Sequence, residues 1–279
     1  MTAADTYAAL SDAVTAQRSR IYGADPQSDP WTGTMAQLFR FHPNRTLDVN
    51  LEVIASYVQP EDVFIDVGGG AGRVSLPMAL QCRESIVVDP SSGMGEEFEA
   101  SKAQAGITNA RRIPTGWLDA NDIHGDVVFS ADVTYFVRDI VPFVHKLEPA
   151  AARRVIIALW SVSPPDRNAE LFQLVYGEEQ APVPGFRDLI AVLWEMGILP
   201  EVRVLPTLPW WEHEVLMTRE DALQMALQGR WLRPEDHDRA RPILEEQFDI
   251  LFSSHNTGFY PKWRKPSLEL LITWETSHG

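Results

Sequence analysis

The feature that most constrains this chain is a group of glycines between an apolar run and a helical run. The apolar run begins at Phe64, and the glycines that follow it are Gly68, Gly69, Gly70 and Gly72. A glycine turn after a buried strand lets the backbone approach a ligand closely, because no Cβ intervenes. The helix that follows points its free N–H groups and its positive dipole end at that ligand. The stretch therefore predicts a strand–turn–helix unit that binds a ligand at its turn.

Strand and helix patterns alternate from residue 62 to residue 160. The run RRVIIALW, at 153–160, is nearly continuous in apolar residues, which suits a strand buried on both faces of a parallel sheet. The alternation predicts a doubly wound, mostly parallel α/β sheet. Strands are expected at 62–67, 85–89, 110–114, 126–131 and 153–160, with helices at about 73–81, 95–105 and 139–147.

The alternation of strand and helix patterns becomes less regular after residue 160. Two further strands are expected at 201–206 and 267–275, and helices at 168–177, 186–197, 218–229 and 234–252. If the two strands pair, the residues between them form an insertion that is rich in aromatic residues and proline.

The first sixty residues carry apolar positions at helical spacing, which predicts helices at 4–21, 32–40 and 46–58. They are expected to form an N-terminal helical cap, residues 1–60. The α/β domain would follow as residues 61–279, with a helical lid insertion at about 208–265. Cap and lid are both expected to close over the carboxyl edge of the sheet, because both lie outside the alternating core and carry aromatic residues beside Gly and Pro, as binding loops often do.

Two classes of cofactor use a glycine turn in a doubly wound sheet, namely dinucleotides and S-adenosylmethionine. The dinucleotide fingerprint is G-x-G-x-x-G. Counted from Gly68, its third glycine would fall on Arg73, so a nicotinamide oxidoreductase is disfavoured. The pattern that fits is Asp66-x-Gly68-x-Gly70-x-Gly72.

That pattern resembles the first motif of the class I S-adenosylmethionine-dependent methyltransferases. The resemblance covers roughly residues 60–160 and includes an acid, Asp89, at the end of the second strand in IVVDPSSGM. It also includes DVVFSA as the fourth strand. It implies a Rossmann-like fold of seven strands with the last one antiparallel, S-adenosylmethionine as cofactor and S-adenosylhomocysteine as product.

The resemblance also implies roles for single residues. Asp89 would accept hydrogen bonds from both ribose hydroxyls; its alternative role is a helix N-cap, for which Ser91 is the better candidate. Asp66 would reach the methionyl ammonium, and Met94 would lie against the adenine or pack in the core. The cofactor-binding set is Asp66, Gly68, Gly69, Gly70, Gly72, Asp89, Pro90, Met94, Gly116, Trp117, Ser130 and Ala131.

The loop after the third strand, TGWLDAND, departs from the family's commoner pattern of a small residue plus an acid. In the family this loop lines the far edge of the adenine, and Asp119 is the nearest acid here. Trp117 either stacks on the base or packs in the core. The residues that close the fourth strand, and so border the cofactor and the reacting methyl group, are Ser130, Ala131 and Asp132.

No isolated catalytic residue stands out. Methyl transfer from a sulfonium is an in-line displacement that needs alignment, and it needs a base only if the acceptor loses a proton. Tyr135, His213 and His255 are candidates for a base or hydrogen-bond donor, or are structural residues. Glu212 and Glu214 flank His213, and on a strand the two acids would face away from it, so no metal site is expected.

The acceptor is expected to be a small molecule, apolar or aromatic, because Trp-rich segments could wall such a ligand; core packing is the alternative. Arg45 either meets an anionic group or makes a surface ion pair. A protein or RNA acceptor is an alternative function, as is a non-catalytic regulatory protein that binds S-adenosylmethionine. The tryptophans concerned are Trp210, Trp211, Trp231 and Trp263.

Composition narrows the partners. The net charge of −15, from 39 acidic and 24 basic residues, argues against nucleic acid, which usually meets clustered Lys and Arg. The sequence shows no secretory signal and no apolar run long enough to span a membrane, so a cytoplasmic protein is expected. The single cysteine, Cys82, excludes an intrachain disulfide and is expected to be a buried structural thiol.

Overall fold

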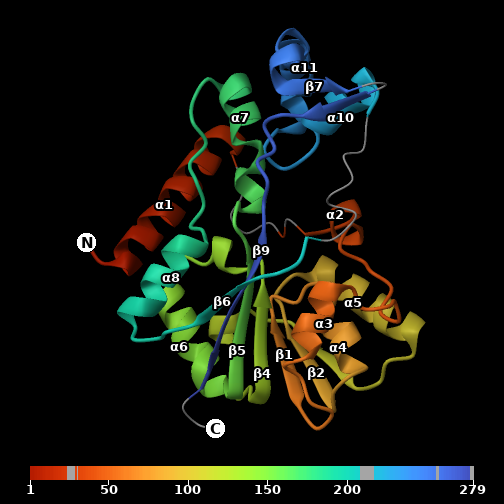
Figure 1. Ribbon diagram of the computed structural model, residues 1–279, viewed down its shortest axis with the longest axis vertical. Helices are drawn as coiled ribbons and strands as arrows, with labels where there is room; N and C mark the ends of the chain where they lie inside the picture. The colour runs from red at the N-terminus through yellow and green to blue at the C-terminus, as the bar shows by residue number, and fades with distance from the viewer. Residues whose placement is uncertain (24–28, 30, 208–216, 256–257, 277–279) are drawn as a thin grey trace.

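The structure, a computed structural model, describes residues 1–23, 29, 31–207, 217–255 and 258–276. Its centre is a seven-stranded sheet in the order β3-β2-β1-β4-β5-β9-β6. Figure 1 labels β2, β1, β4 and β5 side by side in this sheet. The strands are β1 (Val63–Val67), β2 (Glu84–Val88), β3 (Ala110–Ile113), β4 (Gly125–Ala131), β5 (Ala151–Trp160), β6 (Glu201–Val204) and β9 (Glu269–Glu275).

The pairing of the strands confirms the predicted sheet. Strands β1 to β5 are paired in parallel, and β9 lies antiparallel between β5 and β6. The pairing of β6 with β9 means that everything between them in the sequence is an insertion into the sheet. The fold is therefore Rossmann-like and mostly parallel, with an antiparallel last strand.

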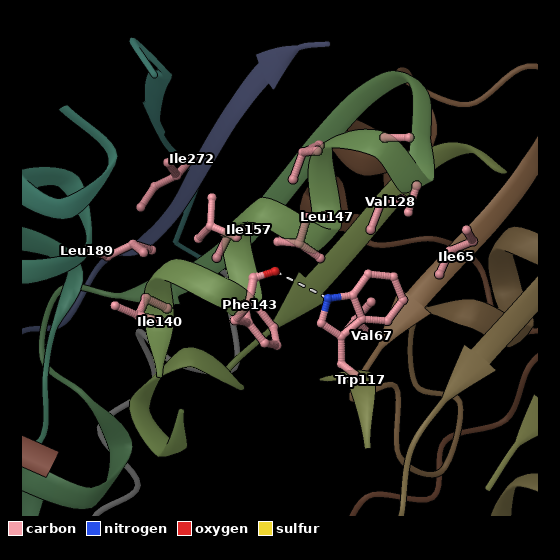
Figure 2. Close-up of a cluster of buried hydrophobic side chains, with 14 of the residues drawn as sticks. Ile65, Val67, Trp117, Val128, Ile140, Phe143, Leu147, Ile157, Leu189 and Ile272 are labelled. Carbon is pink, nitrogen blue, oxygen red and sulfur yellow. Dashed lines mark hydrogen bonds between the residues drawn. The ribbon is translucent and has the colours of Figure 1, made fainter. Parts of the chain in front are cut away.

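Alternate residues of the strands face two helical layers. Ile65 of β1 joins the cluster that contains α6 (Ile140–Ala150) and α8 (Phe186–Glu195), which Figure 2 shows at close range. Phe64, its neighbour in sequence, faces the other way, toward α3 (Val49–Ala55) and α4 (Ser75–Ala79). This period of two is what a strand imposes on its side chains. Both faces of β1 are therefore buried, as the continuous apolar runs predicted.

Local capping fixes the ends of the helices near the glycine turn. The Ser91 hydroxyl accepts a hydrogen bond from the Met94 N–H, so Ser91 is the N-cap of α5 (Ser92–Ala105). Gly106 ends α5 in the left-handed conformation, with φ of 68°. The short helix α4 carries no side-chain cap.

The first sixty residues lie in three places. Helix α1 (Ala3–Tyr22) packs on α8 and α6, while α3 contributes Leu51 and Ile54 to a sheet face. The short α2 (Thr34–Gln37) and its flanking residues approach the N-terminus of α5. The division into a cap of residues 1–60 and a lid of residues 208–265 stays a prediction.

A second core lies beyond the sheet and is built around the insertion (Figure 1). Its buried members include Phe172 of α7 (Ala169–Tyr176), Leu223 of α10 (Arg219–Leu227) and Leu244 of α11 (His237–Glu246). Ile21 and Tyr22, at the end of α1, pack against it. We use the name second core for the buried residues Leu171, Phe172, Val175, Ala222, Leu223, Ala226, Leu227, Trp231, Leu232, Ala240, Leu244, Phe248, Leu251, Phe252 and Trp263.

One prediction for the insertion was wrong in detail. The helix expected at 234–252 is three pieces: a 3-10 turn (Pro234–Asp236), α11 and α12 (Phe248–Leu251). A hairpin of β7 (Phe252–His255) and β8 (Gly258–Pro261) follows and was not expected. Pro234 begins the turn, and the helix divides at Gln247, a break that the spacing of apolar residues does not predict.

The single cysteine, Cys82, is buried, and burial raises the pKa of its thiol to about 11.

Candidate functional site

The glycine turn lies where β1 ends, beside the end of β2. The Gly68 N–H donates to the Val88 carbonyl at 2.8 Å, which extends the β1–β2 pairing into the turn. Gly68, Gly70 and Gly72 all have positive φ, of 72°, 54° and 84°. Residues with a side chain rarely adopt this left-handed backbone conformation. The path of the backbone therefore requires the alternate glycines of the motif.

The surroundings of the glycines differ in a way that bears on ligand binding. A Cβ added to Gly68 would lie 2.3 Å from Val133, and one added to Gly72 would lie 2.7 Å from Leu76. These glycines are needed for packing within the protein. At Gly70 the nearest atom to an added Cβ would be the Met94 sulfur, at 3.5 Å, which is an ordinary contact. Of the glycines in this turn, Gly70 is therefore the one where an added Cβ would not clash.

Asp89 is fixed beside Gly70. Its Oδ2 accepts the Gly70 N–H at 2.9 Å, and its Oδ1 accepts the Ser91 N–H at 2.8 Å. The carboxyl is buried, and burial raises its pKa, although the two N–H donors and Arg112 oppose that rise. Each carboxylate oxygen has a second lone pair, so the group can still accept further hydrogen bonds. Ser91, not Asp89, caps α5.

Asp66 is the most deeply buried acid of the site, with 2% of its surface exposed. Burial raises the pKa of its carboxyl to about 7, while Ser75 and the Arg73 charge partly oppose that rise. A carboxyl in this state gains from a cation, since a positive charge nearby lets it ionise. The carboxyl also lies close to the glycine turn, because a Cβ on Gly69 would be 2.6 Å from Asp66 Oδ2.

An N-terminal segment covers the glycine turn and Met94. Ala36 is buried in one cluster with Ala71 and Met94, and the rings of Trp31 and Phe39 pack against that cluster. The Trp31 and Phe39 rings meet edge to face, with centroids 5.4 Å apart. Met94 thus lies in an apolar environment made by the glycine turn and this N-terminal segment.

Asp29 ties this segment to the N-terminus of α5. Its Oδ2 accepts the Ser91 hydroxyl at 2.9 Å and the Gly93 N–H at 3.4 Å, while its Oδ1 accepts the Trp31 N–H at 2.9 Å. Burial acts to raise the pKa of Asp29, but these hydrogen bonds together lower it. A carboxylate is favoured at this helix end by the free N–H groups and the dipole. This role of Asp29 was not predicted, because nothing in a loop of Gly, Asp and Pro marks one acid as a helix partner.

The end of β4 lies next to the turn. Ser130 is buried and its hydroxyl donates to the Val67 carbonyl at 3.0 Å, so it joins β4 to β1. Asp132 follows Ala131 with φ of 59°, which is an uncommon conformation for a residue with a side chain. Burial raises the pKa of Asp132, opposed first by the charge of Arg73, whose Nη2 lies 3.8 Å from Asp132 Oδ2. Strained residues of this kind cluster at functional sites.

Other predicted site residues lie elsewhere or are already engaged. Trp117 packs in the main core: its indole N–H donates to the Phe143 carbonyl at 3.3 Å, as Figure 2 shows. Of the two roles left open for it, the structure gives core packing. Gly116 precedes it in the loop after β3 and is half-buried, as expected for a loop at this edge. Pro90 is exposed between Asp89 and the N-cap of α5.

The catalytic candidates do not form a site in the described part of the chain. Tyr135 is buried, and its hydroxyl accepts the Trp160 N–H at 2.6 Å, while burial raises its pKa. His255 is the last residue of β7, and its side chain is outside what the structure describes. His213, Trp210 and Trp211 also fall outside the described residues. Arg45 donates to the Arg73 carbonyl at 2.7 Å and so supports the glycine turn itself.

The described residues were also compared with the requirements of a metal site and of a membrane-spanning helix. Among them, no three His, Cys, Asp or Glu side chains gather in the way a bound metal ion requires. Within the same residues, every helix is too short or too polar to cross a bilayer.

Comparisons with known proteins agree with the topology. No family model matches the sequence. An uncharacterized protein of Haemophilus influenzae is 26% identical over 155 residues, which span 55% of this chain and 57% of that protein. Two crystal structures share the fold with TM-scores of 0.53 and 0.54: YcgJ of Bacillus subtilis and BH2331 of Bacillus halodurans, the latter described as a putative methyltransferase. They are 13% and 12% identical, and cover 82% and 81% of this chain and 98% and 96% of their own.

Proposed function

We propose that this chain, which has the fold of the class I S-adenosylmethionine-dependent methyltransferases, binds S-adenosylmethionine and transfers its methyl group to a small-molecule acceptor. The observation that carries the proposal is the pairing of Gly70 with Asp89 across the carboxyl ends of β1 and β2. It brings a glycine with room beside it together with a carboxylate that has free lone pairs. Both belong to the sequence motif of that family.

The residues present fit the cofactor. The lone pairs that remain on Asp89 suit a pair of ribose hydroxyls, because hydrogen bonds to an ionised acceptor are strong. Asp66, buried and without a full charge at neutral pH, suits the methionyl ammonium, which would favour its ionised form. Met94 and the segment over it provide the apolar surface that an adenine requires.

The reaction requires little from protein side chains beyond placement. Bound S-adenosylmethionine supplies an electrophilic methyl carbon and a leaving group that departs as a neutral thioether. The chain holds the donor at the ends of β1 and β2 and leaves the acceptor to approach from the ends of β4 and β5. Such alignment accounts for a large part of the rate of bimolecular reactions in enzymes. No described histidine lies in this site, and the Tyr135 hydroxyl already accepts a backbone N–H.

Calorimetric titration with S-adenosylhomocysteine tests the proposal. We expect one equivalent to bind, and NAD to bind far more weakly. Asp89→Ala should weaken the binding of S-adenosylhomocysteine about ten- to a hundredfold, because a charge-assisted hydrogen bond contributes about 1.5–3 kcal/mol.

Glu96→Ala is the matched control, since Glu96 is an exposed acid on the same helix as Met94 and should leave affinity unchanged. Binding of NAD in preference to S-adenosylhomocysteine, or an unchanged affinity in Asp89→Ala, would contradict the assignment.

A further inference from the structure

Arg167 has a buried guanidinium edge to which no described residue offers a hydrogen-bond acceptor. Its Nε and Nη2 are both buried, and neither has a hydrogen-bond acceptor within the part of the chain that the structure describes. A buried donor without an acceptor costs free energy, and the cost is larger for a charged group. Two such donors on one side chain therefore need an explanation.

The unpaired edge is the one with which arginine binds oxyanions. Nε and Nη2 point in parallel and match the two oxygens of a carboxylate or phosphate. Two other arginines of this chain use it in that way. Arg233 donates from Nε and Nη2 to the two oxygens of Asp236, at 2.6 and 3.1 Å, and Arg138 does the same to Asp12, at 2.7 and 2.9 Å.

Arg167 is held in place by contacts that leave this edge unused. It lies in a 3-10 turn (Pro164–Asn168) just after β5, and its guanidinium carbon sits 4.6 Å from the ring centroid of Trp160. The neighbouring Asn168 accepts the Trp263 indole N–H at 3.2 Å, which connects the turn to the second core. The guanidinium is thus supported by its flat face and not by an ion pair.

The position of Arg167 is that of an acceptor site. Its guanidinium is close enough to Asp132 and Tyr135, at the end of β4, for both to act on its pKa, which burial lowers. The ends of β4 and β5 are where an acceptor would meet the methyl group.

A second arginine, Arg264, lies near Arg167. Arg264, at the base of the insertion, is near enough for its charge to lower the pKa of Arg167 further. Asp132, the opposing acid, is shared with Arg73 at 3.8 Å. Arg73 and Arg167 therefore both act on the Asp132 carboxylate, and Arg264 lies close to Arg167.

We infer that the methyl acceptor carries an oxyanion group, a carboxylate or a phosphate, which binds side-on to Nε and Nη2 of Arg167 with Arg264 close by. This inference rests on the proposed methyltransferase function for the identity of the acceptor. The oxyanion site itself stands on the geometry of Arg167.

Titration with inorganic phosphate and, separately, with acetate tests the site in protein saturated with S-adenosylhomocysteine, at constant ionic strength. Saturation keeps the anions out of the cofactor site. We expect one anion to bind, and Arg167→Gln to weaken it at least about tenfold, as the loss of a charge-assisted hydrogen bond predicts. Arg167→Lys should also weaken it, because lysine keeps the charge but lacks the two parallel donors. Tighter binding of acetate would assign a carboxylic acid acceptor, and tighter binding of phosphate a phosphorylated one.

Arg138→Gln is the control, since its fork already holds Asp12, and it should leave anion affinity unchanged. Retained binding of S-adenosylhomocysteine in Arg167→Gln shows that the variant is folded. Equal anion affinity in wild type and Arg167→Gln overturns the inference and leaves the proposed function intact. Failure of S-adenosylhomocysteine to bind wild type, with Arg167-dependent anion binding in the unsaturated protein, overturns the proposed function and leaves the oxyanion site.

Discussion

Single glycines of one turn serve different purposes here, and substitution separates them. Gly72→Ala places a Cβ 2.7 Å from Leu76 and 2.8 Å from Phe98, both buried. We expect a loss of about 1–3 kcal/mol in the free energy of unfolding from overpacking the core, in addition to backbone strain at a φ of 84°. Gly70→Ala meets only the Met94 sulfur at 3.5 Å, so its cost should be the backbone strain alone, about 1–2 kcal/mol.

The two variants should separate in binding as well. Gly70→Ala puts its methyl group into the space proposed for the cofactor, so S-adenosylhomocysteine should bind it at least about tenfold more weakly, even well below the melting temperature. Chemical denaturation and calorimetry on both variants measure the two effects. Full affinity in Gly70→Ala would mean that the cofactor does not pass this glycine.

Asp66 makes the stability of the protein depend on pH. Its pKa rises from the ordinary 3.8 to about 7 in the folded state because it is buried. Between these values the folded protein binds more protons than the unfolded chain, so the contribution of Asp66 to stability falls as pH rises through that window. Asp66→Asn cannot ionise, and relative to wild type it should gain roughly 2–4 kcal/mol between about pH 4 and pH 7. Denaturant titrations across this range measure the difference, and a difference that stays constant would show that Asp66 ionises normally.

The sequence predicts the residues that the backbone positions and misses those that depend on distant partners. Asp66, the glycines and Asp89 stand at fixed offsets from strand ends, so the motif places them together. The contacts of Asp29 and Arg167 come from elements distant in the sequence, so no local sequence pattern predicts the roles of these two residues. Trp117 shows a different limit of prediction from sequence. A tryptophan in a loop is compatible with stacking on an adenine and with packing in the core, and only its packing against α6 distinguishes the two.

Among the elements, the buried strands were the most predictable, because five apolar runs separated by helices admit few arrangements. The β7–β8 hairpin was missed for the converse reason. Its strands have four residues each, and β7 reads FSSH, with two serines and no alternation of apolar residues. What makes it a hairpin is the packing of Phe252 against Trp263, with ring centroids 5.0 Å apart.

The segment over Met94 is the element most directly coupled to the proposed cofactor. Ala36, Trp31 and Phe39 pack on Ala71 and Met94, so a ligand against Met94 must also touch this segment. We expect S-adenosylhomocysteine to slow amide exchange at residues 66–72 and at 31–39, measured by mass spectrometry. In Asp29→Ala, which removes the link to Ser91, the protection at 31–39 should shrink while that at 66–72 remains. Protection confined to 66–72 in the wild type would place the segment outside the cofactor site.

At the scale of the whole molecule, the second core and the buried residues of the sheet should respond separately to substitution. Phe172, 1% exposed, belongs to the second core, whereas Phe129, also 1% exposed, lies in the sheet. We expect Phe172→Ala to lower the free energy of unfolding by about 3–5 kcal/mol. It should raise amide exchange in α10, in α11 and at the end of α1.

Binding of S-adenosylhomocysteine should survive Phe172→Ala, because the second core holds none of the residues proposed for the cofactor. Phe129→Ala is the comparison and should lose stability and cofactor binding together. Equal loss of cofactor binding in both variants would mean that the second core and the sheet unfold as one.

The positions of the second core's residues along the chain also determine how late this core can form during synthesis. Its members come from α7 and from residues 222–263, and the end of α1 reaches it through Tyr22, whose hydroxyl donates to the Trp231 carbonyl at 2.7 Å. Helix α1 therefore finds these partners only after residues more than 200 positions further along the chain have been translated. Contacts so distant in sequence form late in folding. A transplanted insertion, moved to another protein without α1 and α7, would carry an apolar face with nothing to cover it.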